Sequence, residues 1–194
     1  MSYSHQAPGQ RRLKAAAATA VGCAMLLSAG CTSSGKPVAQ APPSVSASPS
    51  SDPDEAAKQQ VLATYRGLWA AVATIYKSGS MEGANGAELQ KFAAGKALAG
   101  VRASEVYYQD QGLVLKGDPV LSPKVTSIDM AATPPTAQIT SCVDSTDFIP
   151  VDKKTGTPAK LASNEFRHVE NSTAVGGNGA WLITELVIQR DQSC

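Results

Sequence analysis

Gly179-Ala-Trp-Leu-Ile-Thr-Glu-Leu-Val-Ile-Gln-Arg-Asp-Gln-Ser-Cys194 is the stretch that decides the fold. It is rich in β-branched and aromatic residues and follows a Gly-Asn-Gly turn signal at 177–179, so we predict a long β-strand. Apolar side chains occupy both alternating sets of positions, and this pattern favours a central strand with helices covering one face. Cys194, at the end of the strand, needs a partner cysteine.

Helical periodicity dominates the residues between 52 and 111. Asp52-Pro-Asp-Glu55 is a capping box, which predicts a helix start because Asp52 can accept hydrogen bonds from the first-turn amides. Apolar residues then recur at spacings of three and four as far as Tyr76, and Gly79 is a typical terminating residue. We expect a short second helix over 87–94 and a third over 95–111.

Short β-runs follow, separated by Gly, Pro, Asn and Asp. The strands expected before the one at 179 cover 113–115, 120–130, 136–144 and 165–175. Residues 151–156 are expected to form a hairpin turn with glycine at a positive φ. Helices first and strands later predict an α+β domain, with N-terminal helices packed on a curved antiparallel sheet.

Residues 1–30 have the features of a signal peptide. Basic residues at 11, 12 and 14 precede an apolar run over 15–27, which is too short to cross a bilayer. The run ends in Leu-Leu-Ser-Ala-Gly-Cys31, which resembles a bacterial lipobox, although Ser28 stands where leucine is usual. In proteins with this motif the signal peptidase cuts before an acylated cysteine. We therefore expect lipidation at Cys31, with a plain secretory signal as the alternative.

Residues 31–52 are rich in Ser, Pro and Ala and contain almost no large apolar side chain. Such a segment cannot bury enough surface to offset its ordering entropy, so we expect a disordered tether before a single folded domain over 53–194. An acyl anchor at Cys31 would hold that domain at the extracytoplasmic side of a membrane. The formal charge of +1, with no basic block outside the N-terminus, does not support nucleic-acid binding.

Two cysteines remain once Cys23 is lost with the signal peptide and Cys31 is acylated. An exported domain with two thiols most often joins them, so we expect a disulfide between Cys142 and Cys194. The alternatives, a metal site or a reactive thiol, lack support because there is no Cys-x-x-Cys and His168 is far from both cysteines in the sequence.

The chain resembles a group of actinobacterial secreted lipoproteins, most of which have no assigned function. The resemblance covers residues 54–194 and rests on the lipobox, the tether and a set of structural motifs: Tyr65 and Trp69 in the opening helix, Gly112 and Gly117 around a strand, Cys142-Val-Asp144, Thr155-Gly156, Gly179-x-Trp181-x-Ile183 and Cys194. The domain of that group is similar to the NTF2-like, cystatin-like fold, a curved sheet wrapped around helices to form a cone.

The NTF2-like resemblance implies a pocket inside the cone, and relatives include isomerases and dehydratases that use Asp, Tyr or His there. The residues that we single out for ligand binding are Tyr65, Trp69, Tyr108, Asp144 and His168, and the acid–base candidates are Asp144, Tyr107, Tyr108, Asp110 and His168. Structural roles compete with these. The alternation of Phe166, His168 and Glu170 is compatible with a solvent-exposed face, and aromatic residues at helical spacing usually pack in a core.

Two functions from different classes remain. The first is a membrane-tethered, non-catalytic binding or scaffolding module of the cell envelope, which needs no cofactor or metal and acts on an envelope protein or a small apolar ligand. The second is a small isomerase or dehydratase. An apolar interior without convergent polar groups favours the first, and two titratable side chains meeting in a pocket favour the second.

Overall fold

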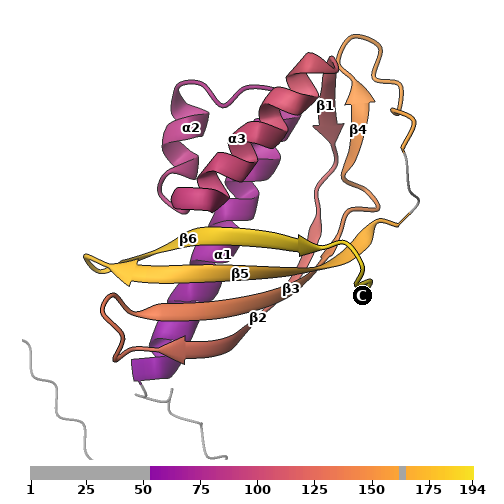
Figure 1. Cartoon of the computed structure of the whole chain (residues 1–194). Coiled ribbons are helices and arrows are strands. Elements are labelled where there is room, and N and C mark those ends of the chain that lie inside the picture. Colours follow the sequence, from indigo (N-terminus) through magenta and orange to yellow (C-terminus); the bar gives the residue numbers. More distant parts are fainter. Residues whose placement is uncertain (1–52, 162–164) are drawn as a thin grey trace, which may run out of the picture. The chain divides into compact units, whose positions relative to one another are not determined.

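The computed structural model describes residues 53–161 and 165–194, so the predicted signal peptide, Cys31, the tether and Asp52 lie outside the described residues. Three helices precede six strands in this part of the chain (Figure 1): α1 Pro53–Ser78, α2 Ala84–Leu89, α3 Gly95–Asp110, β1 Leu113–Lys116, β2 Val120–Asp129, β3 Thr136–Asp144, β4 Ile149–Asp152, β5 Arg167–Gly177 and β6 Ala180–Gln189. None of these helices is both long and apolar enough to cross a membrane.

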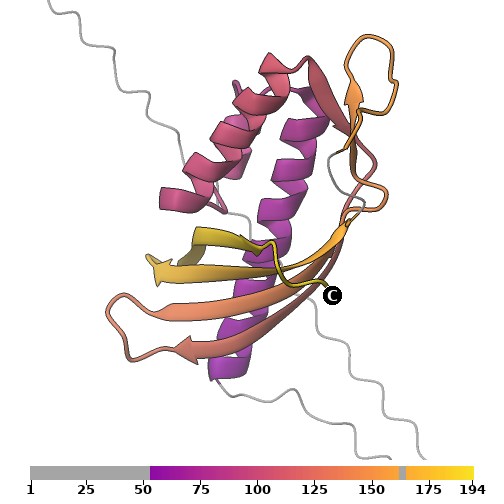
Figure 2. The same cartoon turned by 45° about the vertical axis from the view of Figure 1, so that its right-hand side comes forward.

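Four of the strands form one antiparallel sheet in the order β2-β3-β5-β6, and β1 pairs with β4 in a separate antiparallel ladder. The four-stranded sheet is strongly curved, and α1 runs across it and contacts both of its edge strands, β2 and β6 (Figures 1 and 2). Helix α3 lies against β6 and β1. The predicted α+β architecture, with N-terminal helices packed on a curved antiparallel sheet, is confirmed.

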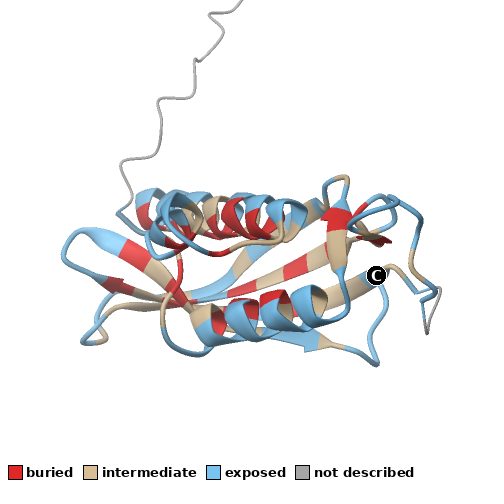
Figure 3. Ribbon diagram, turned by 90° about the horizontal axis from the view of Figure 1, so that it is seen from above, coloured by how far each residue is buried: buried red, intermediate tan, exposed pale blue. Residues whose placement is uncertain are grey.

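The predicted apolar stripe of α1 forms the centre of the core. Side chains spaced by three and four along this helix are buried, among them Val61, Tyr65, Leu68, Val72 and Ile75. They pack against residues from β3, β5 and β6, including Ile139, Ala174 and Ile183. Figure 3 colours the buried residues red and shows them along the helices and strands of the domain. The helix stops where predicted, because Gly79 adopts φ 64°, and the N–H groups of Gly79 and Ser80 both donate to the Ile75 carbonyl (2.8 and 3.3 Å).

The segment after α1 differs from the prediction of a helix over 87–94. Helix α2 begins earlier, at Ala84, and ends at Leu89. Residues 92–94 then lie along the outer edge of β6, where Ile183 donates to the Phe92 carbonyl (2.8 Å) and Ala94 donates to the Ile183 carbonyl (2.9 Å). Pairing with an open strand edge therefore replaces the helical hydrogen bonds that the local sequence favoured.

The prediction that the strand beginning at 179 is central was wrong, because β6 is an edge strand of the sheet. Trp181 and Ile183 belong to the core and Leu186 packs against it, whereas Val187 is 43% exposed. Residues 92–94 cover part of the open edge. The two-sided apolar pattern arises from a β-bulge: Thr184 is left unpaired, so the inward-facing set changes from Trp181 and Ile183 to Leu186.

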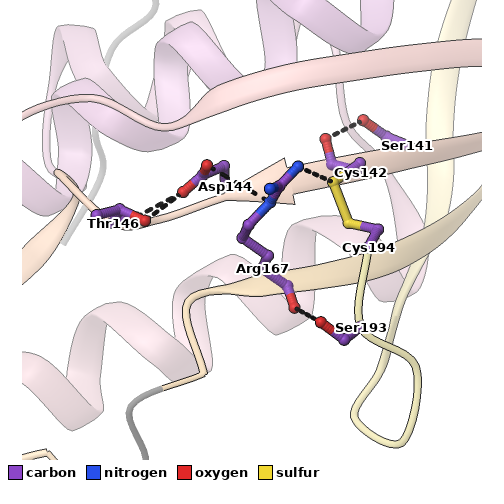
Figure 4. Close-up of a disulfide and its surroundings, with 7 residues drawn as sticks. All are labelled: Ser141, Cys142, Asp144, Thr146, Arg167, Ser193 and Cys194. Carbon is purple, nitrogen blue, oxygen red and sulfur yellow. Dashed lines mark hydrogen bonds and ion pairs between the residues drawn. A yellow bond between two sulfur atoms is a disulfide. The ribbon is translucent and has the colours of Figure 1, made fainter.

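The predicted disulfide between Cys142 and Cys194 is present, with Cα atoms 5.9 Å apart (Figure 4). Cys142 lies on β3, and the residues after β6 reach it past the end of β5. Two hydrogen bonds hold that tail: Val169 N–H donates to the Gln192 carbonyl (3.1 Å) and the Ser193 hydroxyl donates to the Arg167 carbonyl (3.4 Å). The disulfide therefore joins the tail after the edge strand to a strand that is not its neighbour.

The β1–β4 ladder ends in two tight turns. The hairpin turn predicted over 151–156 is present, with Gly156 at φ 71° and its N–H donating to the Asp152 carbonyl (2.8 Å). Gly117, after β1, has φ 86°, and a β-carbon there would lie 1.7 Å from the Asp147 carbonyl oxygen. Only glycine lets these two backbone segments approach so closely.

Candidate functional site

A cavity of about 580 Å³ lies between α1, α3, the β1–β4 side of the domain and the β5–β6 strands. Its volume is within the range of small-molecule sites, which are mostly apolar with a few placed polar groups. Five of the nine aromatic side chains in the described residues line it, namely Trp69, Tyr76, Tyr108, Phe148 and Phe166. Aliphatic side chains from α1, α3 and β6, such as Val72, Val101 and Leu186, complete most of the remaining wall.

Two buried or half-buried polar residues of the wall come from one face of β5. Other polar groups in the lining are supplied by Lys96, Ser104, Ser145, Glu165 and Arg190. His168, Glu170 and Ser172 alternate along this strand with outward-facing residues such as Asn171. His168 lies opposite Val143 of β3 and Glu170 lies opposite Ser141, both of which are buried. The alternation that looked compatible with solvent exposure therefore faces the interior, and His168 and Glu170 both line the cavity.

Glu170 is fully buried and is held by side chains from two elements. Its Oε1 atom accepts hydrogen bonds from the Tyr65 hydroxyl (2.7 Å), the Trp69 indole N–H (3.2 Å) and the Ser172 hydroxyl (3.5 Å). Its Oε2 atom is also buried and has no hydrogen-bond partner among the described residues. Burial raises the pKa of Glu170 to about 7, and the donated hydrogen bonds only partly oppose that rise.

Two of those three donors come from one face of α1. Tyr65 and Trp69 are four residues apart, so their side chains lie on the same face of α1. Burial, followed by the negative charge of Glu170, raises the pKa of Tyr65 well above its usual range, and the phenol therefore stays a hydrogen-bond donor. Buried tyrosine and tryptophan side chains normally find a partner for their polar atom, and here both find the same carboxyl oxygen.

His168 contributes to the same wall a second buried polar atom that lacks a hydrogen-bond partner. Its Nε2 atom is buried and has no partner among the residues that the structure describes. Burial, with a smaller effect from the positive charge of Arg190, lowers the pKa of His168 below its usual value. The imidazole is therefore neutral at pH 7, and one of its two ring nitrogens can accept a hydrogen bond.

Two tyrosines in edge-to-face contact border the cavity on the side of α1 and α3. The ring centroids of Tyr76 and Tyr108 are 5.3 Å apart in an edge-to-face arrangement. Burial raises the pKa of Tyr76 to about 12 and also raises the pKa of Tyr108. Both phenols are therefore neutral and can present ring faces or hydroxyl groups to a ligand.

The structure brings some of the predicted ligand-binding residues together and separates the others. Trp69, Tyr108 and His168 line the cavity. Tyr65 lies behind the wall and reaches the site only through Glu170. Asp144 lies elsewhere, at the end of β3, where it accepts hydrogen bonds from Thr146 and pairs with Arg167 at 3.6 Å (Figure 4).

Among the acid–base candidates, Tyr107 is 60% exposed and Asp110 is exposed at the end of α3. Glu170, the carboxyl that does line the cavity, was not among the predicted site residues. A sequence signal for it existed, because two aromatic donors one turn apart on a buried helix face require an acceptor. Within the described residues, no group of His, Cys, Asp and Glu could hold a metal ion.

Comparison with known proteins identifies no matching family and no matching curated protein. Among solved structures, the chain is similar to the intermembrane space region of the chloroplast protein ARC6. The two share 13% sequence identity with a TM-score of 0.41, over 71% of this chain and 97% of that chain.

Proposed function

We propose that this protein is a membrane-tethered, extracytoplasmic lipoprotein whose folded domain, of the NTF2-like kind, is a non-catalytic module that binds a small apolar ligand. The observation that carries the proposal is the cavity, a 580 Å³ space with five aromatic side chains in its wall and one buried carboxyl. Sites of this size and lining bury most of the surface of a small ligand, while few polar groups fix its orientation.

The location proposed for the module rests on other observations. The lipobox ending at Cys31 and the Ser/Pro/Ala tether support export and anchoring. A disulfide between Cys142 and Cys194 is typical of proteins that fold in an oxidising compartment outside the cytoplasm. The anchor would leave the domain free to take up its ligand beside the membrane.

The proposal is tested by recovering the ligand and by filling the cavity. Gly100 of α3 lines the cavity, and a β-carbon there would meet nothing within 4 Å, so Gly100→Phe places a ring where the ligand would lie. Ala103→Phe, at an exposed position of the same helix outside the cavity wall, is the matched control. Native mass spectrometry of protein purified from its own cell envelope should show a bound small molecule in the wild type and in the control, but not in Gly100→Phe.

A wild-type protein without any bound molecule, or equal occupancy in both variants, would contradict the proposed binding function. Circular dichroism of each variant checks that the fold persists.

A second function, a small isomerase or dehydratase, is favoured by the two titratable side chains in the cavity wall, although Glu170 Oε2 and His168 Nε2 do not hydrogen-bond to each other. Glu170 and His168 line the same cavity, and burial moves the pKa of the carboxyl to about 7, where a group can both take and give a proton near neutral pH. If this function holds, NMR should show the recovered ligand changing with time in the presence of the wild type. Glu170→Gln would abolish that change, whereas an unchanging spectrum with the wild type leaves binding as the function.

A further inference from the structure

We infer that the ligand carries a protonated amine on an apolar body, with the ammonium group held between Glu170 Oε2 and His168 Nε2. This inference rests on the proposed binding function and names the chemistry of its ligand. It begins from the two buried polar atoms of the cavity wall that have no partner among the described residues.

The two atoms belong to residues on the same face of one strand. Side chains at i and i+2 are separated by about 7 Å along a strand. A charged nitrogen that donates to both atoms would lie about 2.8 Å from each, so the ends of the two side chains must converge to within about 5.6 Å of each other. Rotation about the side-chain bonds can bring them together while the backbone stays in place. A neutral partner with one donor could satisfy only one of the two atoms.

Both atoms are suited to accept hydrogen bonds. Burial raises the pKa of Glu170 to about 7, and the three donors to Oε1 only partly oppose that rise, so above pH 7 the carboxyl is ionised and Oε2 is a bare acceptor. His168 Nε2 accepts when the neutral ring carries its proton on Nδ1. An ammonium group has three donors and no acceptor, so it complements a pair of acceptors better than a hydroxyl or a carbonyl does.

The aromatic side chains of the wall also attract a positively charged ligand. Trp69, Tyr76 and Tyr108 line the cavity together with Glu170. Aromatic ring faces attract cations, and the attraction grows when the cation is removed from water. The apolar body of the ligand would then lie against residues such as Phe148 and Leu186.

Other charged groups around the site do not reverse this preference. Lys96 of α3 is exposed and pairs with Glu185 at 2.7 Å. Arg190, after β6, is also exposed, so water weakens its charge, which lowers the pKa of His168 less than burial does. Glu165 adds a negative charge to the wall. The buried Glu105 of α3 bonds to Gln109, and the phenols of Tyr65, Tyr76 and Tyr108, all with raised pKa values, stay neutral.

The test uses two probes that share an indole body. Tryptamine carries an ammonium group and tryptophol carries a hydroxyl at the same position. Isothermal titration calorimetry at pH 6 and pH 8 should show that tryptamine binds the wild type at least tenfold more tightly than tryptophol at pH 8. Its affinity should rise about tenfold from pH 6 to pH 8, because the carboxyl with a pKa near 7 must lose its proton to receive the cation.

Glu170→Gln keeps the shape of the side chain and removes its charge, so it should abolish the preference for tryptamine. His168→Phe keeps a ring but removes both nitrogens. It should weaken the binding of tryptamine several-fold and leave the affinity for tryptophol unchanged. Lys96→Gln, at the exposed rim, serves as a charge control that should retain the preference.

The inference is overturned if tryptophol binds as tightly as tryptamine, if Glu170→Gln keeps the preference, or if tryptamine shows no binding at millimolar concentration. The proposed binding function is judged separately, by ligand recovery and by Gly100→Phe. A recovered ligand without an amine would therefore overturn this inference while the binding function stands.

Discussion

The Tyr65 hydroxyl donates a 2.7 Å hydrogen bond to Glu170, joining the first helix to the middle of β5 across 105 positions of sequence. Both side chains are fully buried. Together with the bond from Trp69, it fixes the carboxyl at the wall of the cavity and connects the helical layer to the sheet. The stability of the domain and the proposed ligand binding therefore both involve the same carboxyl group.

Tyr65→Phe should destabilise the domain by about 1–3 kcal/mol, because it leaves a buried carboxyl without its shortest hydrogen bond while keeping the aromatic ring. The loss should be larger at pH 8 than at pH 5, since the ionised carboxyl is the stronger acceptor. Urea unfolding at the two pH values measures this. Tyr107→Phe, at a 60% exposed position, is the control, and equal free energies of unfolding for the two variants would contradict the prediction.

Glu170 should make the stability of the domain fall as pH rises. Its pKa is raised to about 7 in the folded state, so between its unfolded value near 4.5 and pH 7 the folded state binds more protons than the unfolded state. The contribution is fully present below pH 4.5 and lost above pH 7, a difference of about 3 kcal/mol. Glu170→Gln should remove this slope and be the more stable protein at pH 8.

Denaturant titrations from pH 4 to pH 8 measure that slope directly. Glu82→Gln, which alters an exposed carboxyl, should retain the slope of the wild type. A Glu170→Gln protein with an undiminished slope would show that another group is responsible.

Replacing both Cys142 and Cys194 by serine should reduce the free energy of unfolding by about 4 kcal/mol, since the bond closes a long loop in the unfolded chain. Ligand binding should persist wherever the variant is folded, because neither cysteine lines the cavity. Thermal unfolding with and without reductant provides the comparison. An unchanged melting temperature would mean that the bond contributes nothing to stability.

Gly117→Ala should be severely destabilising, by several kcal/mol, because its β-carbon would lie 1.7 Å from a backbone oxygen that cannot rotate away. Gly112→Ala is a matched control at φ 67° with nothing within 4 Å of the added carbon, and it should cost only about 1–2 kcal/mol. Urea unfolding of the two variants compares the cost of steric overlap at Gly117 with the cost of backbone strain alone at Gly112. Equal costs would contradict the contact at Gly117.

The parts of the fold that were predictable are those set by local patterns. The stripe from Val61 to Ile75 defined α1, and Gly79 marked its end. Residues 92–94 were misassigned to a helix because their partner, Ile183, is far away in the sequence and no local pattern reveals it. The bulge at Thr184, which changes the set of residues that faces inward, likewise made β6 look two-sided in the sequence.

The site was only partly predictable, for a related reason. Trp69 and His168 were identified by residue type, and both line the cavity. The alternation along β5 shows that His168 and Glu170 share a face, but it does not show which face is inside, since neither set of residues is purely apolar. That choice depends on the helices that cover the sheet. The remote position of Asp144 likewise follows from where β3 ends.

The hydrogen bond from Trp69 to Glu170 has an optical consequence. The chain contains two tryptophans, and only Trp69 donates to a carboxyl whose charge changes near neutral pH, whereas Trp181 packs in the apolar core. An indole that gains or loses a neighbouring negative charge changes its emission, so the fluorescence of the unlabelled protein should follow the proton on Glu170. Tryptophan fluorescence would therefore report the protonation state of Glu170 in the cavity wall without any added label.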